Sequence, residues 1–170
     1  MKTWFGSSKV INAWVINASP LIGIGRIDCL GLLSQLVPLI LIPERVLNEV
    51  ATGLGKDAST ARTLAWAAPY RVADVSVPQH VAGWDLGSGE TQVIALCLQD
   101  RSRRAVLDDG DARRCAITVG TPMIGTLGVL LQAKRDGLIT QVRPLTERLV
   151  RSGIYLDQSL IDRALARVGE

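Results

Sequence analysis

The sequence has little cysteine and histidine. Its 170 residues include one histidine and three cysteines, and the cysteines lie far apart without a Cys-x-x-Cys pair. A structural zinc site draws mainly on these residue types, so none is expected. His80 stands alone in a predicted loop, which argues against a serine–histidine–aspartate triad. The separated thiols indicate reduced, buried cysteines and not a disulfide framework.

Long apolar runs are also missing. The longest, residues 29–42, is interrupted by Ser34, Gln35 and Pro38, so no membrane-spanning helix is expected. Residues 1–9 lack the apolar stretch of a signal peptide and are predicted to form a flexible N-terminus. These absences predict a cytoplasmic protein without membrane association.

Two nucleotide-binding motifs fail as well. Residues 53–57 resemble a phosphate loop, but Val50 replaces its first glycine and Asp57 stands where serine or threonine is needed. Gly23 and Gly25 lack the third glycine of the dinucleotide fingerprint. The chemistry that remains available is that of carboxylates.

Short apolar strands alternate with amphipathic helices along the chain. This pattern is typical of a three-layer α/β/α sandwich around a mostly parallel sheet of four to five strands. No linker rich in proline or glycine divides residues 1–170, so we predict a single domain. Residues 140–170 are expected to form C-terminal helices. The last of these has Asp157 as its cap and an apolar stripe that docks on this core or on a partner.

Adjacent acids end one of the short strands. Asp108 and Asp109 follow the apolar residues 105–107, and Asp111 adds a third carboxylate within four positions. Ligands of an open α/β sheet lie outside the carboxyl ends of its strands, so this is a candidate acidic site. The alternative is that one acid caps the next helix, which aspartate does well.

Asn17 is expected at the same edge of the sheet. The first strand ends near Ile16, and Ser19 followed by Pro20 predicts a helix with Ser19 as its N-cap. Asn17 therefore lies where the strand becomes a loop. It is either a site residue or a loop residue that hydrogen-bonds its own backbone.

Two glutamates lie on the inward edges of predicted helices. Glu49 shares a stripe with Val46 and Val50, and Glu90 stands in the first turn of a helix that begins after Gly87. An acid on a buried stripe is unusual unless it is paired or binds metal. The alternatives are a helix end that still reaches water for Glu49 and a helix-dipole acid for Glu90.

Positive charge is concentrated in the second part of the chain. Residues 1–100 carry 7 basic and 8 acidic side chains, whereas residues 101–170 carry 12 basic and 8 acidic ones. Arg113 and Arg114 are among the arginines close to the acidic pair. This distribution suits a polyanion held near metal ions, although the charge taken alone favours an ordinary solvated surface.

The carboxylates and the neighbouring amide form a candidate metal site. Ligand sets made only of oxygen suit Mg²⁺ or Mn²⁺, which activate water and neutralise the charge of a phosphodiester. The candidate ligands are Asn17, Glu49, Glu90, Asp108, Asp109 and Asp111.

Four segments in order resemble the motifs of PIN domains: residues 15–22, 42–49, 86–90 and 107–114. They resemble more closely a VapC-like branch of that superfamily, which the segments 124–134 and 152–156 also match. The resemblance spans residues 14–170, nearly the whole chain.

The resemblance implies a function and a set of site residues. PIN domains are metal-dependent ribonucleases, and many are toxins of bacterial or archaeal toxin–antitoxin pairs. The implied reaction is endonucleolytic hydrolysis of RNA by a metal-bound water. The acidic set of the family falls on Asn17, Glu49, Glu90 and Asp108, with Asp109 or Asp111 as an auxiliary acid.

Partners also follow from the resemblance. Catalysis would rest on Glu49, Glu90 and Asp108. Arg113 or Arg114 would contact RNA phosphate, whereas packing or ion pairing inside the protein is expected for at least one of the two. A small antitoxin protein and a homodimer are expected on the same ground.

Asn17 departs from the family pattern, because most PIN domains have aspartate there. An amide oxygen can ligate Mg²⁺ but adds no charge, so weaker metal affinity is expected. A second function therefore stays open, a catalytically weak or inactive PIN-like module that binds RNA or an antitoxin. A third is a phosphoacceptor domain that is labelled on Asp108 or Asp109.

Overall fold

The computed structural model describes residues 10–170, and the flexible N-terminus predicted at residues 1–9 lies outside them. Its centre is a five-stranded sheet in the order β3-β2-β1-β4-β5, and every pairing is parallel. The predicted α/β architecture is therefore confirmed. The strands are β1 (Ala13–Ile16), β2 (Leu39–Pro43), β3 (Arg71–Val72), β4 (Arg103–Val106) and β5 (Met123–Ile124).

Ten α-helices and one short 3₁₀ helix, η1, surround this sheet within the described residues. Those that precede β4 are α1 (Ala18–Arg26), α2 (Leu30–Leu36), α3 (Glu44–Ala51), α4 (Thr60–Ala67), η1 (Ala68–Tyr70), α5 (Gln79–Ala82) and α6 (Ser88–Leu98). Those that follow are α7 (Gly110–Thr118), α8 (Thr126–Arg135), α9 (Arg143–Arg151) and α10 (Gln158–Ala166). None is long and apolar enough to span a membrane.

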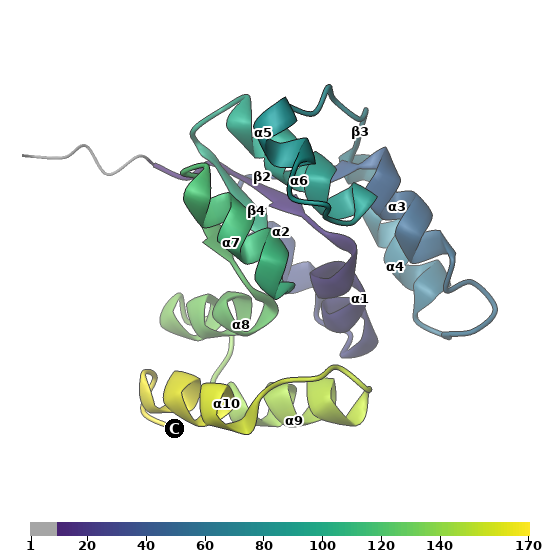
Figure 1. Cartoon of the computed structure of the whole chain (residues 1–170). Coiled ribbons are helices and arrows are strands. Elements are labelled where there is room, and N and C mark those ends of the chain that lie inside the picture. Colours follow the sequence, from purple (N-terminus) through teal and green to yellow (C-terminus); the bar gives the residue numbers. More distant parts are fainter. Residues whose placement is uncertain (1–9) are drawn as a thin grey trace, which may run out of the picture.

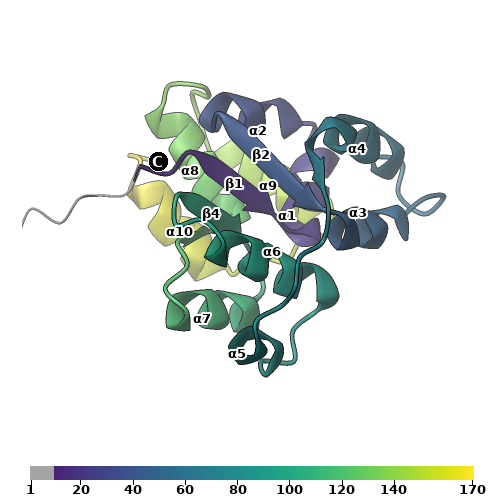
Figure 2. The same cartoon turned by 90° about the horizontal axis from the view of Figure 1, so that it is seen from above.

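Helices cover both faces of the sheet. Figure 2 shows α6 and α7 on one side of the central strands and α2 and α8 on the other. All four residues of β1 are buried, as expected for the middle strand of a sheet covered on both faces. Residues 92–97 of α6 are also all buried, so this helix is the main cover of its face. The first turn of α6 is thereby fixed against the sheet.

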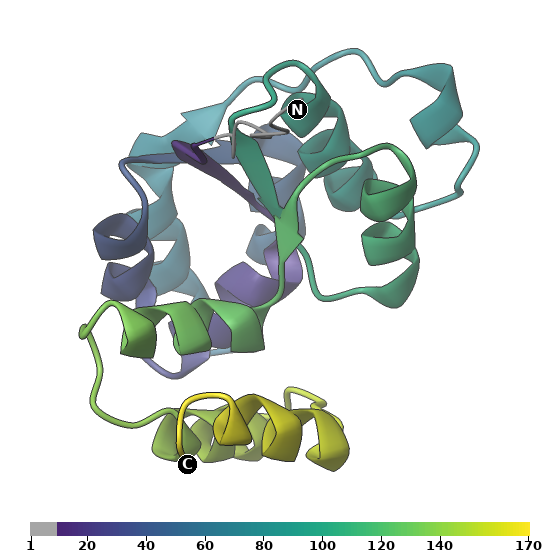
Figure 3. The same ribbon diagram turned by 90° about the vertical axis from the view of Figure 1, so that its left-hand side faces the viewer.

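The C-terminal helices form an additional layer beneath α8 (Figures 1 and 3). Leu149 of α9 and Leu165 of α10 join Leu130 of α8 in a second apolar cluster, separate from the main core. The apolar stripe of the last helix therefore docks on this chain. Its predicted cap is confirmed, because the Asp157 carboxylate accepts a hydrogen bond from the N–H of Leu160 at 3.0 Å.

The first helix begins earlier than predicted. α1 starts at Ala18, so the N-cap position belongs to Asn17 and the assignment of the cap to Ser19 was wrong. Pro20 fits within the first turn because the N–H groups of that turn have no partner inside the helix. The consequence is that Asn17 stands directly between the last residue of β1 and the first residue of α1.

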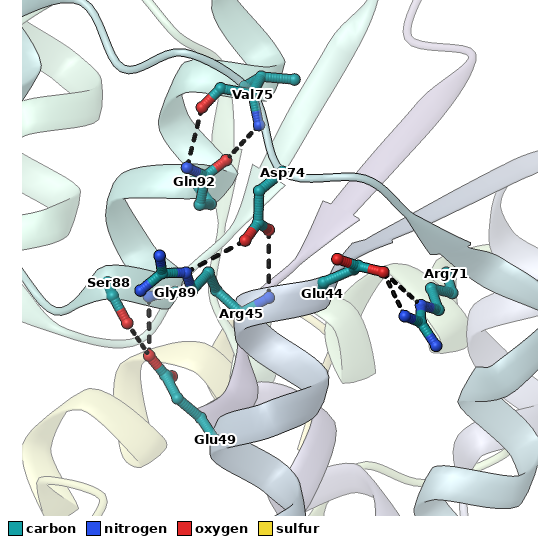
Figure 4. A network of polar contacts seen from close by, with 9 residues as sticks. All are labelled: Glu44, Arg45, Glu49, Arg71, Asp74, Val75, Ser88, Gly89 and Gln92. Atoms are coloured by element: carbon teal, nitrogen blue, oxygen red, sulfur yellow. Dashed lines mark hydrogen bonds and ion pairs between the residues drawn. The ribbon is translucent and has the colours of Figure 1, made fainter.

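Side chains hold the segment that follows β3 against α3 and α6 (Figure 4). The buried Gln92 side chain donates to the carbonyl of Val75 at 3.0 Å and accepts from its N–H at 2.8 Å. The Asp74 carboxylate accepts from the backbone N–H of Arg45 at 3.1 Å and from its Nε at 3.2 Å. The segment that contains Asp74 and Val75 thus joins the amino-terminal turn of α3 to the body of α6.

Glu170 fastens the C-terminal layer. Its carboxylate accepts hydrogen bonds from Lys134 Nζ at 2.6 Å and from the N–H groups of Val142 and Arg143 at 2.8 and 2.9 Å. Burial alone would raise the pKa of Glu170, but these hydrogen bonds outweigh it and lower the pKa from 4.5 to about 2. The carboxylate thus ties α8 to the start of α9.

We predict that Glu170→Gln lowers the free energy of unfolding by about 1–3 kcal/mol near neutral pH, because charged hydrogen bonds to Lys134 and the backbone are weakened. A lowered pKa stabilises the folded state above the unfolded value of 4.5, and that stability is lost as the pH falls toward 2. Urea unfolding across this pH range measures the effect. Glu147→Gln, which removes an exposed acid of α9, is the control. Equal losses in both variants would contradict the prediction.

Candidate active site

Asn17 and Asp108 lie at the carboxyl edge of two neighbouring strands. Ile16 of β1 and Val106 of β4 are in register, and the N–H of Asn17 donates to the carbonyl of Val106 at 3.2 Å. Asp108 follows β4 by two residues. The tertiary structure therefore places the amide and this carboxylate at the edge where parallel sheets bind their ligands.

The Asn17 side chain is buried without a partner. It is 3% exposed, and its Oδ1 accepts no hydrogen bond from residues 10–170. It also makes no capping bond to α1, so the interpretation of Asn17 as a residue that bonds its own backbone is not supported. A buried polar atom without a partner costs free energy, and such atoms are rare in folded proteins. The orphaned oxygen is available to a cation.

Asp108 is oriented by Thr126 at the start of α8. Its Oδ1 accepts from the N–H of Thr126 at 2.7 Å and its Oδ2 from the Thr126 hydroxyl at 2.6 Å. A Cβ on Gly125 would lie 3.1 Å from Asp108 Oδ1 and 2.7 Å from Arg113 Nη1, so a larger residue here would require both side chains to shift. Each carboxylate oxygen has a second lone pair and can accept a further contact.

The role of Thr126 was not predicted from the sequence. The signal was the Gly125-Thr126 pair directly after the last short strand, because this pair starts a helix at the edge where the acids lie. A helix that starts there supplies unpaired N–H groups to a nearby anion.

Glu49 reaches across to the first turn of α6 (Figure 4). Its Oε1 accepts from the N–H of Gly89 at 2.7 Å and from the Ser88 hydroxyl at 3.1 Å. A carboxylate is stabilised at a helix N-terminus by the unpaired N–H groups and the helix dipole. Glu49 therefore connects α3 to α6 and holds the turn that carries Glu90.

Glu90 lies among other acids. Its Oε2 accepts from the N–H of Gly87 at 3.1 Å, which leaves its other oxygen without a described donor. Burial raises the pKa of Glu90, and the charges of Asp109 and Glu49 raise that pKa further. Glu90 therefore experiences the negative charge of both Asp109 and Glu49.

The adjacent aspartates have separate roles. Asp109 Oδ1 caps α7 by accepting from the N–H groups of Asp111 and Ala112 at 2.8 and 2.9 Å. The capping interpretation is therefore confirmed for Asp109, while Asp108 turns toward α8. Asp111 forms an ion pair with Arg114, and both side chains are more than 60% exposed. The structure leaves Asp111 and Arg114 at the surface and does not place them among the groups that perturb Glu90.

The donor set fits a hard divalent cation. Among residues 10–170, no three His, Cys, Asp or Glu side chains already converge in a geometry that could hold a metal ion. However, Asn17 offers its unpartnered Oδ1, and Glu90 and the two acids that act on it, Asp109 and Glu49, offer carboxylate oxygens. Oxygen is the ligand atom that a hard divalent cation prefers. A cation would neutralise this repulsion and satisfy the buried amide oxygen.

Gly89→Ala tests the contact between α3 and α6. The new Cβ would lie 2.6 Å from Glu49 Oε2 and would displace a carboxylate that is held at two points. We expect a loss of about 1–3 kcal/mol in the free energy of unfolding, which outweighs the helix propensity gained by alanine. Thermal or urea unfolding measures it.

Gly31→Ala in α2 is the matched control, because its Cβ would meet only Gln35 Nε2 at 4.0 Å. It should leave the stability unchanged or slightly higher. A Gly89→Ala variant as stable as this control would show that Glu49 is free to move.

Comparison with known proteins identifies the family of this fold and site. A family model described as a PIN domain matches residues 13–170. PIN domains are typically nucleases, generally use divalent metal ions and act on RNA. A search of curated proteins gave no match to the chain. The family match covers more than nine-tenths of the sequence and includes every residue of the acidic edge, so the chain belongs to the PIN-domain family.

Proposed function

We propose that this chain is a metal-dependent endoribonuclease and the toxin of a toxin–antitoxin pair. The observations that support the nuclease are that Asn17 Oδ1 has no hydrogen-bond partner within residues 10–170 and that the charges of Asp109 and Glu49 raise the pKa of Glu90. Membership of a family whose members are typically nucleases points in the same direction.

The proposed mechanism assigns a distinct task to each residue. Asn17, Glu90 and Asp108 would hold Mg²⁺ or Mn²⁺, with Asp109 as an auxiliary ligand. When bound, the ion would activate water and neutralise the phosphodiester. Thr126 orients Asp108, and Glu49 fixes the turn that carries Glu90. Glu49 would add its charge to the cluster through its second oxygen.

Arg113 and Arg114 are the candidates for contacts with RNA phosphate. Arg113 is half-buried, and its Nη1 donates to the carbonyl of Leu107 at 3.2 Å, which sets the guanidinium beside Asp108. It is therefore the better candidate for a phosphate contact near the cut. Arg114 is more exposed and is paired with Asp111, so it would contact RNA only farther from the acids.

A partner protein is part of the proposal. A toxin requires a small antitoxin, and the acidic edge suits an arginine from such a partner, because guanidinium and carboxylate groups pair bidentately. We also propose a cytoplasmic homodimer, as the family resemblance implies.

Cleavage of a mixed RNA pool tests the nuclease. Wild-type protein with Mn²⁺ or Mg²⁺ is expected to cut, and a chelator to stop it. Asp108→Ala should reduce the rate by at least roughly a hundredfold, because it removes charge where the transition state needs it. Glu90→Gln should do the same without disturbing the bonds to Thr126. No metal-dependent cutting by the wild type would overturn the proposal.

Asn17→Asp tests the unusual residue of the site. Without metal, a carboxylate buried beside other acids should lower the melting temperature, because desolvation and repulsion both disfavour it. Mn²⁺ should restore that temperature and raise cleavage above the wild-type rate. Thermal melts with metal and with chelator measure the first effect independently of activity. A variant that melts like the wild type in both conditions would show that position 17 does not face the ion.

The main alternative is a PIN-like module that binds RNA or an antitoxin with little or no catalysis. Asn17 is the observation in its favour, since it supplies no charge to the site. RNA cleavage by the Asn17→Asp variant but not by the wild type would support this binding module. The phosphoacceptor alternative would be supported by labelling of Asp108 or Asp109 from a phosphodonor.

A further inference from the structure

A groove leads away from the acidic edge toward the C-terminal layer. It has a volume of about 530 Å³, and Asp108 and Arg113 are among the residues that line it. α8 forms one wall, and the other is made by α10 and the segment before it, including Tyr155. The groove is thus continuous with the proposed active site but is built largely from residues outside it.

One face of α10 points into this groove. Leu160, Arg163, Ala164 and Arg167 all line it, and their spacing places them along one stripe of the helix. The opposite stripe, with Ile161 and Leu165, is buried in the second apolar cluster. The guanidinium groups are therefore presented to the groove by a helix that is anchored on its other side.

The arginines of the groove are not used by ion pairs. Within residues 10–170, Arg113, Arg163 and Arg167 form no salt bridge with a carboxylate. Arg163 donates only to the carbonyl of Ser159 at 3.2 Å. Asp157 is the acid of this wall, and its carboxylate is occupied as the cap of α10. Basic side chains that form no salt bridge with a carboxylate are suited to phosphate groups.

Tyr155 adds an aromatic surface beside these charges. Its side chain is 89% exposed, the highest value among the large hydrophobic residues that the structure describes as exposed. Leu127, Leu131 and Leu156 give the groove an apolar lining close to it. An aromatic ring next to arginines is the usual platform for an unpaired base of single-stranded nucleic acid.

We propose that this groove binds the single-stranded RNA next to the scissile phosphate. A base stacks on Tyr155, and flanking phosphates contact Arg163 and Arg167, while the strand continues past Arg113 to the acids. The proposal rests on the nuclease function, because Asp108 marks the place of the cut. It makes the C-terminal layer a part of the substrate-binding surface.

The test measures binding apart from cleavage. Fluorescence anisotropy of a labelled, unstructured RNA oligonucleotide is recorded with Glu90→Gln protein in chelator, so that no cutting occurs. In this background Tyr155→Ala should weaken binding by about five- to a hundredfold, because one base loses its stacking partner. Tyr155→Phe keeps the ring and should keep the affinity.

The arginines are tested by the salt dependence of binding. The double variant Arg163→Gln, Arg167→Gln should lower the slope of log affinity against log salt by roughly 1.4, which corresponds to two phosphate contacts with a single strand. The matched control is Arg135→Gln, Arg151→Gln, which removes the same charge from exposed positions outside the groove. Circular dichroism verifies that each variant is folded.

The outcomes separate the two proposals. Loss of binding in the groove variants but not in the control supports the groove, whether or not the wild type cuts. Groove variants that bind like the control overturn the groove, while metal-dependent cutting by the wild type would leave the nuclease standing. If the wild type neither binds nor cuts RNA, both proposals fail.

Discussion

Repulsion between acids at one edge of a parallel sheet is the constraint on which the site depends. Glu90 cannot lie near Asp109 and Glu49 without a free-energy cost, and its raised pKa reflects both burial and these charges. Hydrogen bonds to the neighbouring acids offset this cost. The N–H of Gly89 donates to Glu49, and two backbone N–H groups of α7 donate to Asp109. Asn17 Oδ1 has no donor within residues 10–170. In the function that we propose, a bound cation would stabilise this edge.

The scaffold limits the freedom of this edge from two sides. α6 is buried along residues 92–97, and Glu49 ties its first turn to α3. Farther along α6, Gln92 holds Val75 in the segment that follows β3. On the other side, α8 starts at Thr126 and continues into the layer that Glu170 fastens. The same helix therefore orients Asp108 and supports the groove that we assign to RNA.

The class of fold and the candidate reactive groups could be predicted from the pattern of residues along the chain. Strands that alternate with helices and carry no long polar linker can bury their apolar faces only as a layered α/β structure. The absence of clustered cysteine and histidine leaves carboxylates as the reactive groups. The cap at Asp157 was also predictable, because capping is a local interaction between residues close in the chain.

Only the tertiary structure decided which acids meet and what each one does. The pairing of β1 with β4, which brings Asn17 beside Asp108, joins segments about ninety residues apart. No local pattern could predict that Glu49 accepts a hydrogen bond from the N–H of Gly89, or that Tyr155 and Asp108 line the same groove. Periodicity identifies the face of a helix that is buried, whereas the partner of that face depends on strand order and helix packing across the whole chain.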